Sequence, residues 1–201
     1  MMFTERPPGH LILASSSPRR AELMKSAGYQ FRVIAPDDDA EDGFRDGERP
    51  SDGVARLAYQ KAKNVAKKYH QGLFIGCDTV GEVDGKILGK PANRKEALSM
   101  LLSMSGRQHR VFSGLCVWQR PENRTVIRVQ ETLLEMKTLS ATFLEEYLDS
   151  NQWRGKAGAF GFQDGLNWIQ IIKGSPSNVV GLPMEILAEV LDDLTNDPVN
   201  P

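Results

Sequence analysis

The chain has 201 residues, of which 40% are hydrophobic, and its formal net charge is -1. This length and composition allow a sizeable buried core, in one domain or in two closely packed lobes. A charge so close to zero gives no overall field that would attract nucleic acid or a membrane surface, so neither is expected as a partner. No apolar run approaches the length that spans a bilayer.

The cysteines and the two ends of the chain indicate a compartment and a domain plan. Cys77 and Cys116 lie in apolar, strand-like runs, where buried reduced thiols are expected rather than a disulfide. The start, MMFTERPPGH, lacks the apolar stretch of a signal peptide, so the protein is expected to be cytoplasmic. We expect an N-terminal extension at 1–10, a single domain at 11–194 and a flexible tail at 195–201.

Strand-like and helix-like segments alternate along the chain. The first half predicts a strand at 11–14, a helix at 18–27, a strand at 31–35, an acidic loop at 37–50, a helix at 54–69 capped by Ser51, a strand at 73–77, and a hairpin at 80–88. The second half predicts a helix from Asn93 to Gly106, strands at 110–118 and 124–136, a helix at 140–150, a glycine-rich loop at 155–165, a strand at 166–172, and a helix from Pro183. This order favours an α/β fold with a mixed central sheet flanked by helices.

Two arginines stand at the start of the first predicted helix, in LASSSPRRAELM. Ser17 and Pro18 are a good N-cap and first residue, yet Arg19 and Arg20 then lie in the first turn, where the helix dipole disfavours cations. A solvated first turn is one interpretation. The other, which we favour, is a phosphate site: the backbone N–H groups, the hydroxyls of 15–17 and two guanidiniums all donate hydrogen bonds to phosphate oxygens.

Lys61 interrupts an apolar face of the second predicted helix. Val54, Leu57, Ala58, Ala62 and Val65 form that face at helical spacing, and the lysine falls near its middle. A lysine there either extends its ammonium to the edge of the core or meets a buried anion, and the pattern alone leaves both open.

The segment IGCDTVGEVDGKILGKP at 75–91 contains a buried strand that we expect to end at Asp78-Thr79. Functional groups gather at such strand ends in open α/β sheets, so Asp78 is a candidate cation ligand or general base. The alternative is that it binds backbone donors of a turn. Lys90, held between Gly89 and Pro91, is expected to present a positioned ammonium.

The glycine-rich segment GKAGAFGFQDG at 155–165 combines two phenylalanines with Gln163. Either it is an ordinary loop, or its rings stack on a nucleobase that the Gln163 amide then selects. The three histidines are scattered along the chain, and each is expected to be structural or exposed.

Together, LILASSSPRR, the KA at 61–62, CDTV with DGKILGKP, LSMSGRQHRVFSG, and KAGAFGFQ with VVGLP resemble the Maf family, over residues 11–190. The resemblance implies the inosine-triphosphatase-like fold, with a cleft between two lobes. It also implies a nucleoside triphosphate pyrophosphatase that cleaves between the α- and β-phosphates, gives monophosphate and pyrophosphate, and uses a divalent cation, Mg²⁺ or Mn²⁺. The family further suggests a homodimer.

The same resemblance assigns roles to individual residues. Asp78 matches the catalytic aspartate, described as the proton acceptor. The matching polar positions around the phosphates are Ser15, Arg19, Arg20, Lys61 and Lys90, and we place Lys61 and Lys90 in the catalytic group and Ser17 with the phosphate-binding residues. Arg19, Thr79 and Gln163 match the positions that mark the dTTP/UTP group. Thymine and uracil present an N3–H donor beside carbonyl acceptors, which a glutamine amide complements.

Two positions depart from the family pattern. Asp164 follows Gln163 where many relatives have glycine, which bears on the charge of the base pocket. Ala40 stands where the family often has an acidic residue that is a candidate metal ligand, with Asp39 and Glu41 on either side. We predict a metal site of Asp78 and Glu41.

Two other functions compete with cleavage of dTTP and UTP. One is a pyrophosphatase for another modified nucleotide such as 7-methyl-GTP, which Thr79 and Gln163 argue against. The other is a regulator of cell division that binds nucleotide without cleaving it. The presence of Asp78, Lys61 and Lys90 argues against a protein that only binds.

Overall fold

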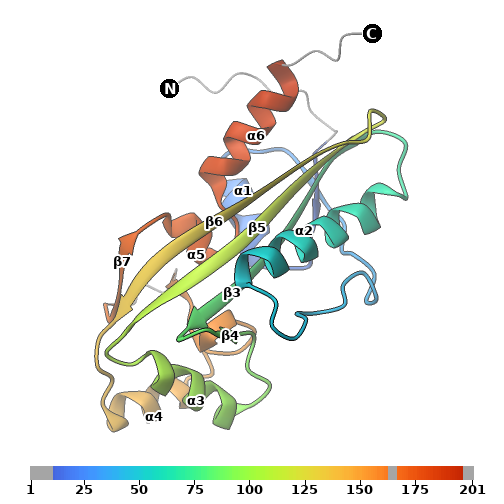
Figure 1. Cartoon of the computed structure of the whole chain (residues 1–201). Coiled ribbons are helices and arrows are strands. Elements are labelled where there is room, and N and C mark those ends of the chain that lie inside the picture. Colours follow the sequence, from blue (N-terminus) through green and yellow to red (C-terminus); the bar gives the residue numbers. More distant parts are fainter. Residues whose placement is uncertain (1–10, 163–166, 197–201) are drawn as a thin grey trace.

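The computed structural model describes residues 11–162 and 167–196. In this part of the chain seven strands form one sheet (Figure 1). The strands are β1 (Leu11–Ala14), β2 (Arg32–Val33), β3 (Gly72–Val83), β4 (Lys86–Leu88), β5 (Gln108–Arg120), β6 (Arg124–Met136) and β7 (Ile169–Lys173). The helices are α1 (Pro18–Ser26), α2 (Pro50–Ala66), α3 (Arg94–Met104), α4 (Ala141–Asp149), α5 (Pro176–Val180) and α6 (Met184–Asn196), with the 3-10 turn η1 (Ala157–Ala159).

The sheet is mixed, as the sequence predicts. Its order is β2-β1-β3-β5-β6-β7, and β4 pairs with the far end of β3. β1 pairs in parallel with β2 and β3, whereas the pairs among β3, β4, β5, β6 and β7 are antiparallel. Because β3, β5 and β6 are long, they run through both halves of the molecule (Figure 1).

Helix α2 packs directly on the backbone of β3 and β5. A Cβ added at Gly76 would lie 2.2 Å from the carbonyl oxygen of Ala58, and one at Gly114 would lie 2.1 Å from that of Val54. No side chain fits at that distance, so the two glycines permit this close approach. Ala58 and Ala62 keep the facing side of α2 small as well.

The opposite face of the sheet is covered by α1 and α6. Their contacts form one apolar cluster of Leu13, Met24, Ile75, Cys77, Leu115, Val117, Leu182, Leu187, Val190, Leu191 and Leu194. Both cysteines are buried and free, which confirms the expectation of buried thiols. This cluster and the α2 face together make the first lobe.

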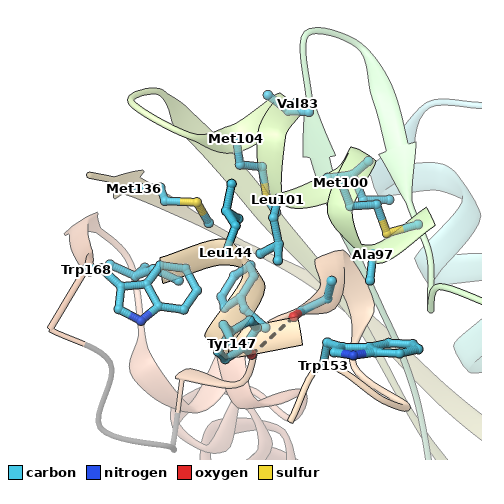
Figure 2. Close-up of a cluster of buried hydrophobic side chains, with 14 of the residues drawn as sticks. Val83, Ala97, Met100, Leu101, Met104, Met136, Leu144, Tyr147, Trp153 and Trp168 are labelled. Carbon is cyan, nitrogen blue, oxygen red and sulfur yellow. Dashed lines mark hydrogen bonds between the residues drawn. The ribbon is translucent and has the colours of Figure 1, made fainter. Parts of the chain in front are cut away.

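The second lobe surrounds the other end of the long strands. There α3, α4 and η1 enclose a second apolar cluster, part of which is drawn in Figure 2. Leu101 and Met104 of α3 are buried in it. The Tyr147 hydroxyl donates to the carbonyl oxygen of Ala159 at 3.2 Å, which ties α4 to the glycine-rich segment. The predicted architecture of two lobes around a mixed sheet is therefore confirmed.

Differences from the sequence prediction lie mostly at element ends. Helix α2 begins at Pro50 with Arg49 as N-cap, so Ser51 is not the cap; a proline in the first turn fits the start of a helix. The strand predicted at 31–35 is Arg32–Val33. Helix α6 continues to Asn196, while 1–10 and the rest of the expected tail lie outside the described residues. Nowhere in the described ranges is a helix both long and apolar enough to cross a membrane.

Candidate functional site

The site begins at a gap beside strand β3. β1 pairs with β3 up to Ala14 and Gly76, and β4 pairs with the same side of β3 from Gly81 onward. Within the described residues no strand covers 77–80 on that side, whereas β5 covers the other side throughout. The prediction that the strand ends at Asp78-Thr79 is therefore wrong: the strand continues, and its exposed edge provides the opening.

A cleft of about 350 Å³ lies at this gap, between the two lobes. Its wall contains almost all of the predicted site residues: Ser15, Ser17, Arg19, Arg20, Glu41, Lys61, Asp78, Thr79 and Lys90. The exception is Gln163, which lies outside the described residues together with Asp164. Segments that are far apart in sequence therefore converge, as their shared chemistry predicts.

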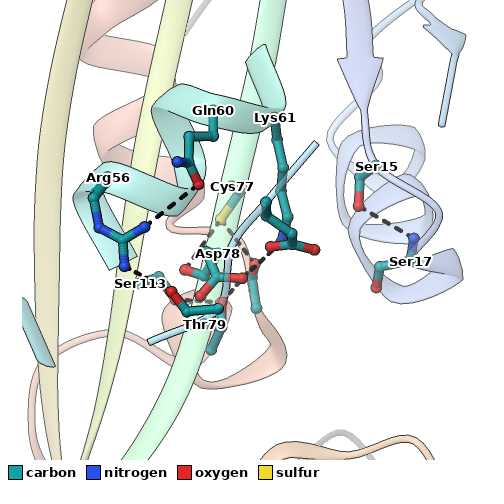
Figure 3. Close-up of polar contacts among 12 residues, drawn as sticks. Ser15, Ser17, Arg56, Gln60, Lys61, Cys77, Asp78, Thr79 and Ser113 are labelled. Atoms are coloured by element: carbon teal, nitrogen blue, oxygen red, sulfur yellow. Dashed lines mark hydrogen bonds and ion pairs between the residues drawn. The ribbon is translucent and has the colours of Figure 1, made fainter. Parts of the chain in front are cut away.

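On the α2 side of the sheet the cleft carries a charged cluster. The Lys61 ammonium lies 2.6 Å from Asp78 Oδ1 and 2.9 Å from Glu41 Oε2. The side chains of Lys61 and Asp78 are only 12% and 13% exposed. Of the two alternatives for Lys61, the buried anion is therefore the one found, and Figure 3 shows the ammonium directed at Asp78.

On the opposite face of β3 the Thr79 hydroxyl lies in a hydrogen-bond network that contains no carboxylate partner of Thr79 among the described residues. Its Oγ1 is 2.8 Å from Ser113 Oγ and 3.2 Å from the Gly181 carbonyl oxygen. Beside it, burial raises the pKa of the Cys77 thiol, and Sγ lies 3.2 Å from the same carbonyl oxygen. A buried thiol with a raised pKa is unsuited to act as a nucleophile.

Arg20 binds three groups of the protein. Its Nε donates to the Gly181 carbonyl oxygen at 2.7 Å, Nη1 to Ser15 Oγ at 3.1 Å, and Nη2 to Thr79 Oγ1 at 3.3 Å. Ser15 Oγ also accepts from the backbone N–H of Ser17, at 3.1 Å. Ser17 is the N-cap of α1 by position, although its own side chain makes no cap hydrogen bond. The guanidinium thus joins the β1–α1 loop to β3 and to the end of α5.

Arg19 and Lys90 approach the cleft from its rim. Arg19 Nη2 donates to the carbonyl oxygen of Gly155 at 3.2 Å, which connects α1 with the glycine-rich segment of the second lobe. Lys90 is exposed and follows Gly89, whose carbonyl oxygen accepts from the Gly158 N–H at 3.0 Å. The two cations therefore lie on backbone segments that are tied to the same part of the second lobe.

Part of the remaining wall is apolar. Val111, Phe160, Val179 and Val180 contribute to it. Behind Phe160 lies His109, whose ring makes an edge-on contact at a centroid distance of 5.5 Å. Burial lowers the pKa of His109 to about 4, so this histidine is neutral and structural, as predicted. His70 is exposed.

Sequence reasoning missed the helix α5, which builds one side of the cleft. Buried Asn178 holds it in place: Nδ2 donates to the Val111 carbonyl oxygen at 3.1 Å and to Thr132 Oγ1 at 2.9 Å. The signal was present in GSPSNVV, because Ser175 is an N-cap and Pro176 follows at the first helical position.

The acidic side of the cleft fits a divalent cation in part. Glu41 and Asp78 direct hard oxygen ligands at one point, which a lysine ammonium now bridges. Within 11–162 and 167–196, however, no three acidic, histidine or cysteine side chains are grouped so as to hold a metal. Mg²⁺ keeps several water ligands and is often bound by only one or two carboxylates together with substrate phosphates, so this donor set suits such a cation.

Comparison with known proteins gives consistent results. A family model described as Maf-like protein matches residues 10–194. A protein of Rhodopirellula baltica named dTTP/UTP pyrophosphatase is 51% identical over 187 residues, which cover 92% of this chain and 82% of the relative. Proteins of the same name from Dictyoglomus thermophilum and Geotalea uraniireducens are 38% and 41% identical, each over 92% of this chain and 95% and 93% of their own.

Proposed function

This chain belongs to the Maf-like family, and on that premise we propose that it hydrolyses dTTP and UTP between the α- and β-phosphates. The observation that carries the proposal is the cleft, which combines the Lys61–Asp78 pair with Ser15, Arg19 and Lys90. Relatives that match over more than nine-tenths of this chain bear the name dTTP/UTP pyrophosphatase.

We assign Asp78 as the proton acceptor. Its Oδ1 contacts Lys61, and the carboxylate has a second oxygen to accept a proton from water. The water oxygen attacks the α-phosphorus, the bond from that phosphorus to the bridging oxygen breaks, and pyrophosphate leaves with the bond's electron pair. The products are one nucleoside monophosphate and one pyrophosphate, with no covalent enzyme intermediate.

The cations around the cleft have distinct tasks in this proposal. Arg19 and Lys90 bind the β- and γ-phosphates, and Lys61 stabilises charge that develops during the reaction. Ser15 and Ser17 line the same loop at the N-terminus of α1, where backbone donors favour an anion. Arg20, which is held by Gly181, Ser15 and Thr79, fixes this loop and adds its charge to the phosphate site.

A divalent cation, Mg²⁺ or Mn²⁺, would be held by Glu41 and Asp78, and when bound it neutralises charge on the phosphates. The nucleobase is expected against the apolar wall of Val111, Phe160 and Val179. We propose that Gln163 reads its edge and that Thr79 and Arg19 influence selectivity through the segments they hold, Gly181 and Gly155.

Turnover of a nucleotide panel tests this function. Purified protein with Mg²⁺ or Mn²⁺ would be given dTTP, UTP, CTP, ATP, dGTP, ITP and 7-methyl-GTP, with phosphorus NMR of the products. We expect monophosphate and pyrophosphate, fastest from dTTP and UTP. Preference for 7-methyl-GTP or another purine nucleotide would contradict the proposed selectivity for thymine and uracil, but not the proposed reaction. Tight binding without cleavage of any nucleotide would contradict the enzyme and favour a nucleotide-binding regulator.

We also propose that the enzyme works in the cytoplasm. Two free, buried thiols are compatible with a reducing cytoplasm. We retain the homodimer as a family-based prediction, for which light scattering after gel filtration is the measurement, and we expect neither nucleic acid nor membrane as a partner.

A further inference from the structure

The acidic loop at 37–50 is bound to one stripe of helix α2. Asn64 accepts from the backbone N–H of Asp37 and donates to its carboxylate, both at 3.1 Å, and the Lys68 ammonium lies 2.6 Å from the same carboxylate. Further along, the ring of Phe44 packs against Gly53, where an added Cβ would lie 2.1 Å from it. The loop therefore has a defined position on the helix.

Arg56 makes the strongest set of contacts on this stripe. Its Nε and Nη2 donate to the two carboxylate oxygens of Glu48 at 2.7 and 2.6 Å, a bidentate pair. Nη2 also donates to the Gly43 carbonyl oxygen at 2.7 Å, and Nη1 is bonded to Asp42. The side chains of Arg56 and Glu48 are 18% and 12% exposed, so little water competes for these bonds.

Glu41 lies between the two attachments. It directly precedes Asp42, which Arg56 binds, and follows four residues after Asp37, which Asn64 and Lys68 bind. Glu41 itself is 40% exposed and reaches Lys61 at 2.9 Å. Its carboxylate is brought opposite Asp78 by the backbone of the loop, and Arg56 determines where that backbone runs.

We propose that Arg56 is a positioning residue for the acidic side of the cleft: it holds the loop so that Glu41 faces Asp78, and so sets the affinity for a divalent cation. This inference rests on the proposed function, in which Glu41 and Asp78 are the cation ligands. Residues that orient a metal ligand affect metal affinity, because their loss typically lowers it by about 10- to 100-fold.

Binding of Mn²⁺ to the free protein, measured by the loss of the electron paramagnetic resonance signal of aqueous Mn²⁺, tests the role of Arg56 without turnover. In Arg56→Met we expect the Mn²⁺ dissociation constant to rise by about 10- to 100-fold. Arg56→Lys keeps the charge but not the bidentate geometry, and should give an intermediate rise. Arg49→Met is the matched control: Arg49 stands at the end of the same loop, its side chain bonds only Asp52 among the described residues, at 2.8 Å, makes no cap hydrogen bond and is 78% exposed. Its Mn²⁺ affinity should equal that of the wild type.

The second measurement is turnover of dTTP against Mn²⁺ concentration. A positioning role predicts that excess Mn²⁺ restores most of the turnover in Arg56→Met, whereas a loss of folded protein would not be restored. Unchanged Mn²⁺ affinity in a folded Arg56→Met would overturn the inference, and if that variant does not fold, Arg56→Lys decides in the same way. A wild type that binds Mn²⁺ but cleaves no nucleotide would contradict the proposed function and leave the Arg56 result standing; one that binds no Mn²⁺ would overturn this inference.

Discussion

Asp78 and Thr79 are neighbours in sequence, yet they lie on opposite faces of β3 in chemically different surroundings. On the α2 face, Asp78 shares the Lys61 ammonium with Glu41, and all three groups carry charge. On the α5 face, the half-buried Thr79 hydroxyl donates to the Gly181 carbonyl oxygen, lies 2.8 Å from Ser113 Oγ and accepts from the Arg20 guanidinium, with no ion pair at Thr79 itself. Strand alternation alone produces this separation.

This difference indicates which face of β3 can respond to a ligand. Ion pairs that line a cleft can exchange a partner for phosphate or metal, because each charge remains compensated. A buried hydroxyl network loses more when one member is removed, since the others are left without partners. We therefore expect reaction chemistry on the Asp78 face and shape and selectivity on the Thr79 face.

The largest effect is expected from Asp78→Asn. The amide cannot accept the proton from water, so kcat should fall by about 10²- to 10⁴-fold while nucleotide binding persists. Pyrophosphate release and calorimetric binding of dTTP would be measured together. Asp84→Asn is the matched control, since Asp84 is an exposed carboxylate at the turn of the β3–β4 hairpin. Retained turnover in Asp78→Asn would show that Asp78 is not the proton acceptor.

His109, whose ring packs edge-on against Phe160, tests whether burial keeps this titratable group neutral. Burial lowers its pKa to about 4 from 6.5, so between these values the unfolded chain binds a proton that the folded protein does not. Stability should therefore fall as the pH is lowered from 6.5 to 4, by about 3 kcal/mol in all. His109→Leu removes the titration and should flatten this part of the profile of unfolding free energy against pH.

A control separates His109 from the other titrating groups. His70→Gln, at an exposed position, should keep the slope of the wild type. The carboxylates of Asp42 and Glu48 have pKa values lowered to about 2, each chiefly by an arginine hydrogen bond, Arg45 for the first and Arg56 for the second. Their stabilisation is lost as the pH falls from the unfolded-state pKa values of 3.8 and 4.5 to about 2. A slope above pH 4.5 that persists in His109→Leu would contradict the assignment.

Close packing of α2 is a condition for the charged face, and Gly76→Ala tests it. The new Cβ would meet the Ala58 carbonyl oxygen at 2.2 Å, so the helix must shift, at a cost of about 2 kcal/mol in unfolding free energy. Gly89→Ala is the control, because nothing lies within 4 Å of a Cβ there. Chemical denaturation measures both, and equal stability of the two variants would show that α2 adapts freely.

Sequence patterns predicted the members of the site better than their arrangement. Residue type and spacing marked Lys61 as an anomaly and predicted an anion site at the arginine pair, because both violate simple rules of burial and helix charge. They could not show that β3 continues past Asp78. The pairing that leaves its edge open depends on where β1 and β4 end, and both ends are set by tertiary contacts.

Two further features were hidden for related reasons. The proposed role of Arg56 depends on a loop that folds back on α2 and contacts it through Gly43 and Glu48. No local periodicity in the sequence predicts that the loop contacts the helix in this way. Arg20 and Arg19 are adjacent and identical in type, yet one binds Gly181 and the other Gly155. Adjacent helix positions point about 100° apart, so the direction was predictable but the partner was not.

The smallest effect on stability is expected from substitution of Thr79, which lies next to Asp78 but on the opposite face of β3. Thr79→Val keeps the shape but removes the hydroxyl, so Ser113 and Arg20 each lose a partner, which should cost about 1 kcal/mol of stability. Because Gly181 is held by the same hydroxyl, we also expect a modest loss of discrimination between UTP and CTP in kcat/KM. Thr79→Ser retains the hydroxyl and should resemble the wild type in both measurements. If serine instead behaves like valine, the methyl group and not the network governs this face, and selectivity comes from packing against the base.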